Sequence, residues 1–264
     1  MESYLGIFDS HVHLNDEKYT NAGITVKSYI EENVSAGVFY FLNVCCHLSE
    51  AEKLIDSTLK YDHLYCSVGI HPLYVEQKFT DEARNRIKSF LSNEKVVAIG
   101  ETGLDYYYKK DEKTKKVQID SFVNHIKLAQ EFQKPLIIHC REAFREVYQT
   151  LAKFDGSITG VIHCFTGNLE YAKKFVGLGF YISFAGQITF KNTKDLQDVV
   201  KQIPLEKILI ETDGPYLSPH PYRGLLNKSK YLKETIKKIA ELKQIPSQEV
   251  IKITTLNAKK LFKI

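Results

Sequence analysis

Six acidic or imidazole side chains stand just past the ends of short apolar runs, and these runs are spread over nearly the whole chain. They are His11 and His13 after YLGIFDS, Glu101 after VVAIG, His139 after PLII, His163 after ITGVI, and Asp213 after KILIET. Short apolar runs are typical of buried strands. Imidazole and carboxylate groups are ligands for ions such as zinc, manganese and magnesium. The pattern therefore predicts strands whose ends converge on one metal centre.

Eight candidate strands alternate with helical patterns from one end of the chain to the other. Most are rich in Val, Ile, Leu or Phe at successive positions, as parallel strands buried on both faces are. They are expected at 5–8, 38–44, 65–69, 95–100, 136–139, 159–163, 180–183 and 207–210.

Helical patterns fill the spaces between the strands. An apolar stripe predicts a helix over 112–133, and two further helices are expected near 229–243 and 247–263. Ser49 and Glu52 have the spacing of a capping box, so another helix is expected to begin there.

The placement of the candidate ligands distinguishes between two kinds of parallel sheet. In an open doubly wound sheet, ligands gather at one switch point, whereas in a closed barrel the strand ends form one rim. His11 follows the first strand, Glu101 follows the fourth and Asp213 follows the eighth. A closed barrel is the simple way to bring them together. The sequence thus predicts an α/β fold, a TIM (β/α)8 barrel, with residues 1–264 as a single domain.

The composition is that of a globular protein with an ordinary core, since 44% of the residues are hydrophobic and 26% are charged. No apolar stretch reaches the length of a membrane span, and the N-terminus lacks the pattern of a signal peptide. The five cysteines have no zinc-clip spacing, so reduced thiols and a cytoplasmic location are expected. The net charge of +4 permits an anionic substrate without requiring one.

Four more residues are expected to act together with the candidate ligands. Asp9 and Asp105 are expected to support ligands, and Asp105 could also contact the substrate. His71, in GIHP, is expected to contact the substrate or to donate a proton. Arg141 follows His139 in the same phase and is expected to face an anionic group. Simpler explanations exist for single residues: a histidine after a strand can be an ordinary loop residue, and Asp213 before Gly-Pro can be a turn former.

A run of aromatic and basic residues follows the fourth strand. Tyr106, Tyr107 and Tyr108 precede Lys109 and Lys110. Aromatic rings next to lysines suit the stacking of bases beside a neutralised nucleic-acid backbone. The alternative is the solvated start of a helix, with the tyrosines in the core.

Taken in order, the motifs DSHVHL, GIHP, GETGLDYYY, IIHCR, HCFTG and ETDGPYL closely resemble those of the TatD family of metal-dependent deoxyribonucleases, within the amidohydrolase-like barrels. The resemblance implies a TIM barrel with a site for two divalent metal ions of the Mg, Mn, Zn or Co kind. It implies that one ion is held by His11, His13, Glu101 and Asp213, and the other by Glu101, His139 and His163, so that Glu101 bridges them.

The resemblance also implies an activity, which is hydrolysis of DNA phosphodiester bonds, with exonuclease action on single strands. Asp213 would take the proton of the attacking water, and His71 and Arg223 would meet the phosphate or the departing oxygen. A monomer that binds DNA and no membrane is expected. The alternative is hydrolysis of a small-molecule or aminoacyl ester or amide, including D-aminoacyl-tRNA deacylation. Similar barrels with that chemistry often carry a carboxylated lysine where this chain has Glu101, which favours the nuclease.

The chain departs from the family pattern at two places. Ser10 replaces the usual threonine, and the Arg-Asn-Glu-Pro run expected after Arg223 and Gly224 is absent, although Asn227 is kept. The resemblance implies that this last loop borders the substrate. The departures are therefore expected to affect substrate choice and rate rather than the metal ligands.

Overall fold

Eight parallel strands lie side by side in chain order, and each is hydrogen-bonded to the next. The computed structural model describes residues 6–76, 79–108, 110–154 and 156–264. The segment after the last strand completes the ring, because Val12 pairs with Gly214 and the Asp213 N–H donates to the His11 carbonyl. The strands are β1 (Ile7–Val12), β2 (Val38–Val44), β3 (Leu64–Val68), β4 (Val96–Asp105), β5 (Leu136–Arg141), β6 (Gly160–Ile162), β7 (Tyr181–Phe184) and β8 (Ile208–Ile210). The predicted TIM barrel is confirmed.

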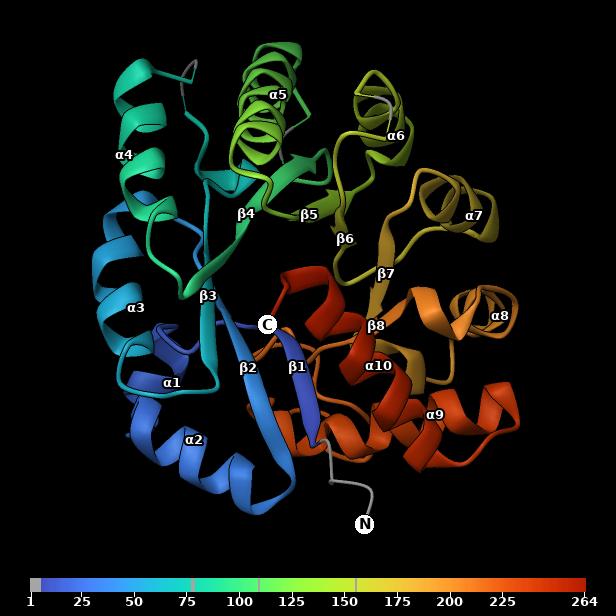
Figure 1. Cartoon of the computed structure of the whole chain (residues 1–264). Coiled ribbons are helices and arrows are strands. Elements are labelled where there is room, and N and C mark those ends of the chain that lie inside the picture. The colour runs from blue at the N-terminus through green and yellow to red at the C-terminus, as the bar shows by residue number, and fades with distance from the viewer. Residues whose placement is uncertain (1–5, 77–78, 109, 155) are drawn as a thin grey trace.

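Helices form a layer outside the strands (Figure 1). They bury apolar faces against the barrel, which is how a (β/α)8 fold makes its outer core. Within the described residues, none of these helices is long and apolar enough to cross a membrane. The helices are α1 (Glu17–Asn21), α2 (Val26–Ser35), α3 (Ala51–Thr58), α4 (Asp81–Leu91), α5 (Glu112–Phe132), α6 (Phe144–Ala152), α7 (Leu169–Gly177), α8 (Lys194–Gln202), α9 (Leu232–Lys243) and α10 (Ser247–Phe262).

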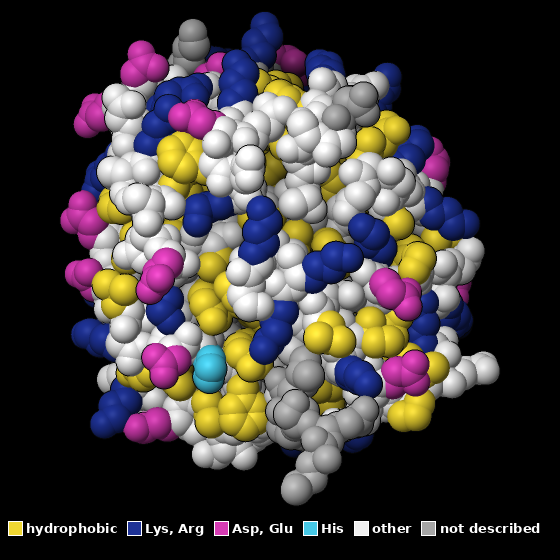
Figure 2. Space-filling model, viewed as in Figure 1, with side chains coloured by type: hydrophobic (Ala, Val, Ile, Leu, Met, Phe, Trp, Pro, Cys, Tyr) yellow, Lys and Arg dark blue, Asp and Glu magenta, His cyan; other side chains and the backbone are white. Residues whose placement is uncertain are grey.

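The last helix, α10, covers the end of the barrel at which the strands begin (Figure 1). Leu261 and Phe262 pack on inward-facing residues of the strands, and the Thr255 hydroxyl donates to the Gly6 carbonyl just before β1. Basic and acidic side chains are interspersed over this face, in keeping with the small net charge (Figure 2). The opposite rim, where the strands end, is left for the functional residues.

Three strand boundaries differ from the prediction in a way that matters for the site. His11 and Glu101 lie inside β1 and β4 rather than after them, and β5 continues two residues beyond His139, where the predicted strand ended. An apolar run marks only the part of a strand that is buried in the core. Backbone pairing with the neighbouring strand can continue past that run, through polar residues, so the strand ends later than predicted. In β4, pairing with β5 extends as far as Asp105, which lies opposite Arg141.

The capping box predicted at Ser49 and Glu52 is wrong. A 3-10 turn, Leu48–Glu50, precedes α3, and α3 begins without a side-chain cap. The Ser49 N–H instead donates to Nδ1 of His47 at 3.2 Å. The hydrogen bond from the Ser49 N–H to His47 thus takes the place of the reciprocal hydrogen bonds expected between Ser49 and Glu52. The helix expected near 229–243 also begins as a separate 3-10 turn, which α9 follows.

One buried carboxylate ties the two ends of the barrel sheet together. Asp9 is fully buried in β1, where it accepts hydrogen bonds from the Thr212 N–H at 3.0 Å and the Thr212 hydroxyl at 2.6 Å. The Ser229 hydroxyl donates to the same carboxylate at 2.6 Å. Burial raises the pKa of Asp9 to about 6, although the hydrogen bonds from Ser229 and Thr212 act in the opposite direction. Asp9 therefore supports the segment that carries Asp213, as the sequence suggested.

Replacing Asp9 by alanine is expected to lower the free energy of unfolding by about 3 kcal/mol, because four buried donors, the His11 N–H at 3.4 Å among them, lose their acceptor. Urea unfolding of the metal-free protein measures this effect. Asp198→Ala is the matched control, since Asp198 is exposed and its side chain pairs with Lys201 on the surface. The control should change stability by less than about 0.5 kcal/mol. An equal loss in the two variants would show that Asp9 does not have this structural role.

Candidate metal centre

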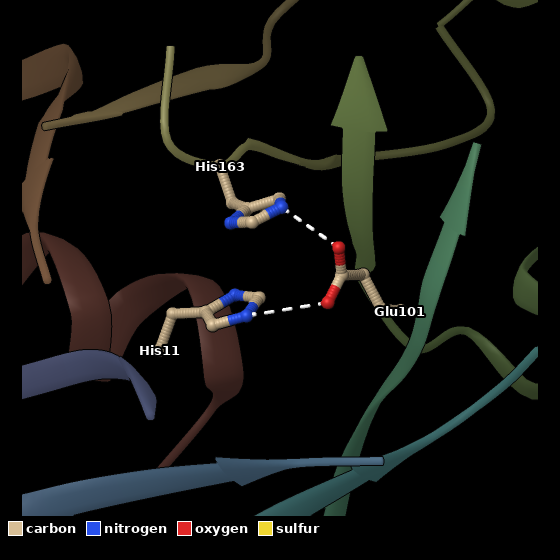
Figure 3. A group of neighbouring side chains, drawn as sticks. All are labelled: His11, Glu101 and His163. Atoms are coloured by element: carbon tan, nitrogen blue, oxygen red, sulfur yellow. Dashed lines mark ion pairs between the residues drawn. The ribbon is translucent and has the colours of Figure 1, made fainter. Parts of the chain in front are cut away.

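All six predicted ligands meet at the rim where the strands end, and Glu101 lies at their centre. Its Oε2 is 3.3 Å from Nε2 of His11, and its Oε1 is 2.9 Å from Nε2 of His163 and 3.0 Å from Nδ1 of His139. The carboxylate points between the stacked rings of His11 and His163, with one oxygen toward each (Figure 3). Glu101 is 2% exposed, so its two oxygens face these side chains rather than solvent.

The Oε2 side of Glu101 holds one group of ligand atoms. Nε2 of His11 and Nε2 of His13 are 3.1 Å apart. Oδ1 of Asp213 is 3.3 Å from Nε2 of His13 and 3.8 Å from Nε2 of His11. Two imidazoles and two carboxylates from β1, β4 and the segment after β8 therefore surround one small volume.

Two of the histidines, His13 and His139, have a hydrogen-bond acceptor on the ring nitrogen that faces away from this centre, and in His163 that nitrogen lies near a carboxylate. An acceptor there takes the N–H of the neutral ring, so the nitrogen that faces Glu101 presents a lone pair. The pairs are Nδ1 of His13 with the Val44 carbonyl at 3.2 Å, Nε2 of His139 with Asp105 Oδ2 at 3.0 Å, and Nδ1 of His163 with Glu211 Oε1 at 3.4 Å.

His71 has the opposite arrangement. Its Nδ1 accepts a hydrogen bond from the Leu73 N–H at 3.1 Å, so the proton of the neutral ring lies on Nε2. That Nε2 is 3.2 Å from Oε1 of Glu101 and 3.2 Å from Nδ1 of His139. Burial lowers the pKa of His71 and favours the neutral ring. The side chain therefore offers an N–H to the site, which suits a hydrogen-bond or proton donor better than a ligand.

The charges of the site favour a bound cation. Burial opposes ionisation of Glu101, but His163 and the other surrounding histidines outweigh it and hold the pKa of this carboxyl well below its usual range. Burial likewise opposes ionisation of Asp213, yet its pKa is lowered by hydrogen bonding to His13 and by the nearby imidazoles. In turn, Glu101 and Glu211 hold the pKa of His163 well above its usual value against the effect of burial. Without a cation, protons on the imidazoles balance the carboxylates, and a metal ion can replace those protons.

The donor set fits divalent ions in both type and spacing. Atoms that bind one ion at about 2.1 Å lie roughly 3 to 3.5 Å apart. The nitrogen and oxygen atoms on each side of Glu101 have nearest-neighbour distances in that range. The Oε2 group and the Oε1 group could therefore each hold one cation, with Glu101 shared between them.

Two residues that the sequence did not single out also belong to the site. Glu211 is fully buried beside His163, and one of its oxygens accepts a hydrogen bond from the Cys164 N–H at 2.6 Å. Its position at the end of the last apolar run was a signal that could have identified it. The sulfur of Cys46 is 3.7 Å from both Nδ1 of His13 and Oε2 of Glu101. No sequence pattern distinguished this cysteine from the buried thiols of Cys45, Cys66 and Cys140.

Close backbone approach between β4 and β5 explains two of the glycines in the GETG motif. Gly100 and Gly103 have φ angles of +150° and +134°. A Cβ atom at Gly103 would lie 2.0 Å from the carbonyl oxygen of His139, and one at Gly100 would lie 2.6 Å from that of Ile137. These two glycines allow Glu101 and His139, on adjacent strands, to come within hydrogen-bonding distance.

The predicted substrate contacts are placed around the rim. Arg141 is exposed after His139, and Arg223 is exposed in the loop after β8 with its guanidinium carbon 3.8 Å from the centre of the Phe190 ring. Tyr106 is only half-buried and packs on the core, with Lys115 5.1 Å from its ring. Lys109 lies outside the described residues.

The loop after β8, where the chain departs from the family pattern, is fastened to the barrel. The Asn227 side-chain amide donates to the carbonyls of Thr212 and Tyr216 at 2.8 and 2.7 Å. Lys228 pairs with Glu32 at 2.7 Å, and Ser229 donates to Asp9 as described above. Two of the departing residues, Lys228 and Ser229, thus make structural contacts in this chain.

Comparison with known proteins gives a consistent result. The family model described as TatD related DNase matches residues 8–263. An uncharacterized metal-dependent hydrolase, YabD of Bacillus subtilis, is 41% identical over 260 residues, which cover 98% of this chain and 99% of the relative. An uncharacterized metal-dependent hydrolase of Escherichia coli, YcfH, is 36% identical over 98% of this chain and 96% of its own length. The crystal structure of a TatD homologue from Escherichia coli, YJJV, superposes with a TM-score of 0.89 at 25% identity and covers 99% of each chain.

Proposed function

The chain belongs to the TatD-related DNase family and is a metal-dependent hydrolase, and we propose that residues 1–264 form one enzyme domain that cleaves phosphodiester bonds of DNA. We propose further that two divalent cations bind on either side of Glu101 and that the enzyme acts as an exonuclease on single strands. The Mg, Mn, Zn and Co ions all remain candidates, because histidine–carboxylate sites accept each of them.

The observation that supports this proposal most strongly is the orientation of the ring nitrogens. The outer nitrogens of His13 and His139 have acceptors, and that of His163 lies 3.4 Å from Glu211, so each ring can keep one proton on its outer nitrogen and turn a lone pair toward Glu101 once its inner nitrogen is deprotonated. Lone pairs and carboxylate oxygens that face one another in a buried place repel unless a positive charge lies between them. Protons on the imidazoles supply that charge when no metal is bound, and divalent cations can replace them.

When bound, divalent ions neutralise phosphate oxygens and lower the pKa of a water molecule toward neutrality. The chain supplies the other parts of the reaction. Asp213, ionised because its pKa is lowered, would orient the attacking water and accept its proton. His71 would donate its Nε2 proton in a hydrogen bond to the phosphate or to the departing oxygen. Glu101, which contributes one oxygen to each group of ligands, would hold the two groups at a fixed separation.

Exposed cations on the rim support an anionic polymer as substrate. Arg141 is the last residue of the ligand strand β5, and Arg223 lies in the loop that follows Asp213. Contacts of arginine with backbone phosphates position a nucleic acid without reading its sequence. We propose that Arg223 contacts the phosphate at the cleaved bond, with Arg141 further along the strand.

Removal of metal is expected to stop hydrolysis of end-labelled single-stranded DNA. After incubation with a chelator and dialysis, activity should fall to background, and Mn²⁺, Mg²⁺, Zn²⁺ or Co²⁺ should restore it to different degrees. A gel of end-labelled DNA and RNA, single- and double-stranded, measures substrate preference and direction in the same experiment. Undiminished hydrolysis by protein whose metal content has been shown to be negligible would contradict the proposal.

The alternative substrates are tested with the same preparations. Cyclic amides, simple phosphate esters and D-aminoacyl-tRNA represent carbon–nitrogen and ester hydrolysis. The metal-restored enzyme is expected to cleave DNA faster than any of these. A preference for an amide or aminoacyl ester, with DNA left intact, would replace the nuclease assignment by the second class.

A further inference from the structure

An exposed arginine lies against the rings of two exposed tyrosines beside the candidate metal centre. The guanidinium carbon of Arg141 is 4.1 Å from the ring centre of Tyr107 and 4.9 Å from that of Tyr108. The two rings are perpendicular, with centres 4.8 Å apart, and they are 43% and 60% exposed. We call these three residues the Tyr-Arg platform.

The platform is joined to the metal centre through a single buried carboxylate. Oδ1 of Asp105 accepts hydrogen bonds from the Tyr107 and Tyr108 N–H groups, both at 3.0 Å. Oδ2 of the same residue faces Nε2 of His139 at 3.0 Å. On the other strand, Arg141 is two residues from His139, and its carbonyl accepts from the Tyr106 N–H at 2.9 Å. The platform is therefore held in a defined position next to a residue that faces Glu101.

Its chemistry matches an unpaired nucleobase. A base stacks on the flat face of an aromatic ring or of a guanidinium, whatever its identity. Arg141, whose guanidinium is planar and held close to the Tyr107 ring, also carries a charge that suits the neighbouring phosphate. Lys110 adds a second cation, 5.7 Å from the ring of Tyr107. A base inside a duplex has both faces covered, so such a surface can be used only by an unpaired base, as at a single-stranded end.

We propose that Tyr108 and Arg141, supported by Tyr107, stack on a nucleobase one or two nucleotides from the cleaved bond and so select for single-stranded ends. This inference rests on the proposed function and deepens it, because it assigns a strand-selective contact to residues that do not face Glu101. Stacking does not depend on base identity, so little sequence preference is expected at this position.

Binding is best measured with metal-loaded protein in which Asp213 is replaced by asparagine, because hydrolysis is then suppressed. The probe is a fluorescein-labelled oligothymidylate, and its fluorescence anisotropy gives the affinity. Tyr108→Ala and Arg141→Ala, each added to this parent, are expected to weaken binding by about 5- to 150-fold, the range for loss of one stacked base. Tyr108→Phe keeps the ring and should restore the affinity. Leu256→Ala, at an exposed apolar residue of α10, is the matched control.

A second set of probes separates stacking from a general electrostatic effect. In these oligonucleotides one of the three terminal nucleotides is abasic, and the abasic position is moved from probe to probe. At one abasic position, the parent protein should bind the abasic strand as weakly as Tyr108→Ala binds the intact strand. Tyr108→Ala should bind that abasic strand no more weakly than it binds the intact one. Arg141→Lys keeps the charge without the planar group, so it should resemble Arg141→Ala with the intact strand.

The outcomes distinguish this inference from the proposed function. If the wild-type enzyme cleaves single-stranded DNA but Tyr108→Ala binds intact strands as tightly as its parent does, the platform is not a base contact. The same conclusion follows if Tyr108→Ala lowers the affinity for intact strands and for abasic strands by the same factor, whatever the abasic position. If the wild-type protein neither binds nor cleaves DNA, both the platform and the nuclease assignment are wrong.

Discussion

Replacement of Glu101 by alanine is expected to remove the bound metal on both sides of the site and to reduce DNA hydrolysis by at least about a thousandfold, the upper part of the range for loss of one electrostatic stabiliser. The expectation follows from geometry, because Oε1 and Oε2 of Glu101 belong to different groups of ligand atoms. Elemental mass spectrometry after dialysis measures the metal, and end-labelled DNA measures the rate.

Two further variants make this prediction specific. Glu101→Gln retains the shape and one carbonyl oxygen but replaces the other oxygen by a group that cannot bind a cation, so it should lose metal from one side more than from the other. Glu170→Ala, at an exposed acid that pairs with Lys174, should leave both metal content and rate unchanged. If Glu101→Ala retained wild-type metal content, the shared position of this residue would be wrong.

Replacement of Asp213 by asparagine is expected to lower the rate of hydrolysis by about 10²- to 10⁴-fold, the usual contribution of a general acid or base. Metal content should remain close to that of the wild type, because asparagine keeps one oxygen near Nε2 of His13 and the other ligands are intact. Asparagine also tolerates the left-handed backbone at this position, where φ is +54°.

The separation of rate from metal content is what makes the Asp213 result informative. Rates at saturating DNA, taken together with metal analysis, distinguish a lost base from a lost ligand. A parallel fall of metal content and rate would show that Asp213 acts mainly as a ligand. An unchanged rate with bound metal would show that another group accepts the proton.

The barrel and the meeting of the six ligand candidates could be predicted from the sequence because both depend on regular patterns. Apolar runs reveal strands, and parallel strands in a closed barrel place their ends on one rim. His11 and Asp213, 202 positions apart in the chain, are brought together by that topology alone. The strand boundaries were less predictable, because β4 continues to Asp105 through residues that pair by their backbone.

The roles of individual side chains depend on contacts that no sequence pattern contains. Whether His71 offers a lone pair or an N–H depends on the Leu73 N–H that meets its Nδ1. The partnership of Glu211 with His163 likewise joins two segments that are distant in the chain. The stacking of Arg141 on Tyr107 arises because the ends of β4 and β5 lie side by side. Side-chain partners of this kind are set by the three-dimensional fold.

The loop after β8 shows how a departure from a family pattern can have a structural role. Ser229 donates to the buried carboxylate of Asp9, and Lys228 pairs with Glu32 of α2. These contacts hold the loop that carries Arg223 while leaving Arg223 exposed. The effect of the departures on substrate choice remains a prediction, to be tested by the substrate panel described above.

The number of cations and their positions are tested most directly by anomalous diffraction from crystals grown with Mn²⁺ or Zn²⁺. Two anomalous peaks are predicted, one near Oε2 of Glu101 among His11, His13 and Asp213, and one near Oε1 between His139 and His163. No peak at this rim, or a single peak at saturating metal that does not contact Glu101, would contradict a centre in which Glu101 is shared by two ions.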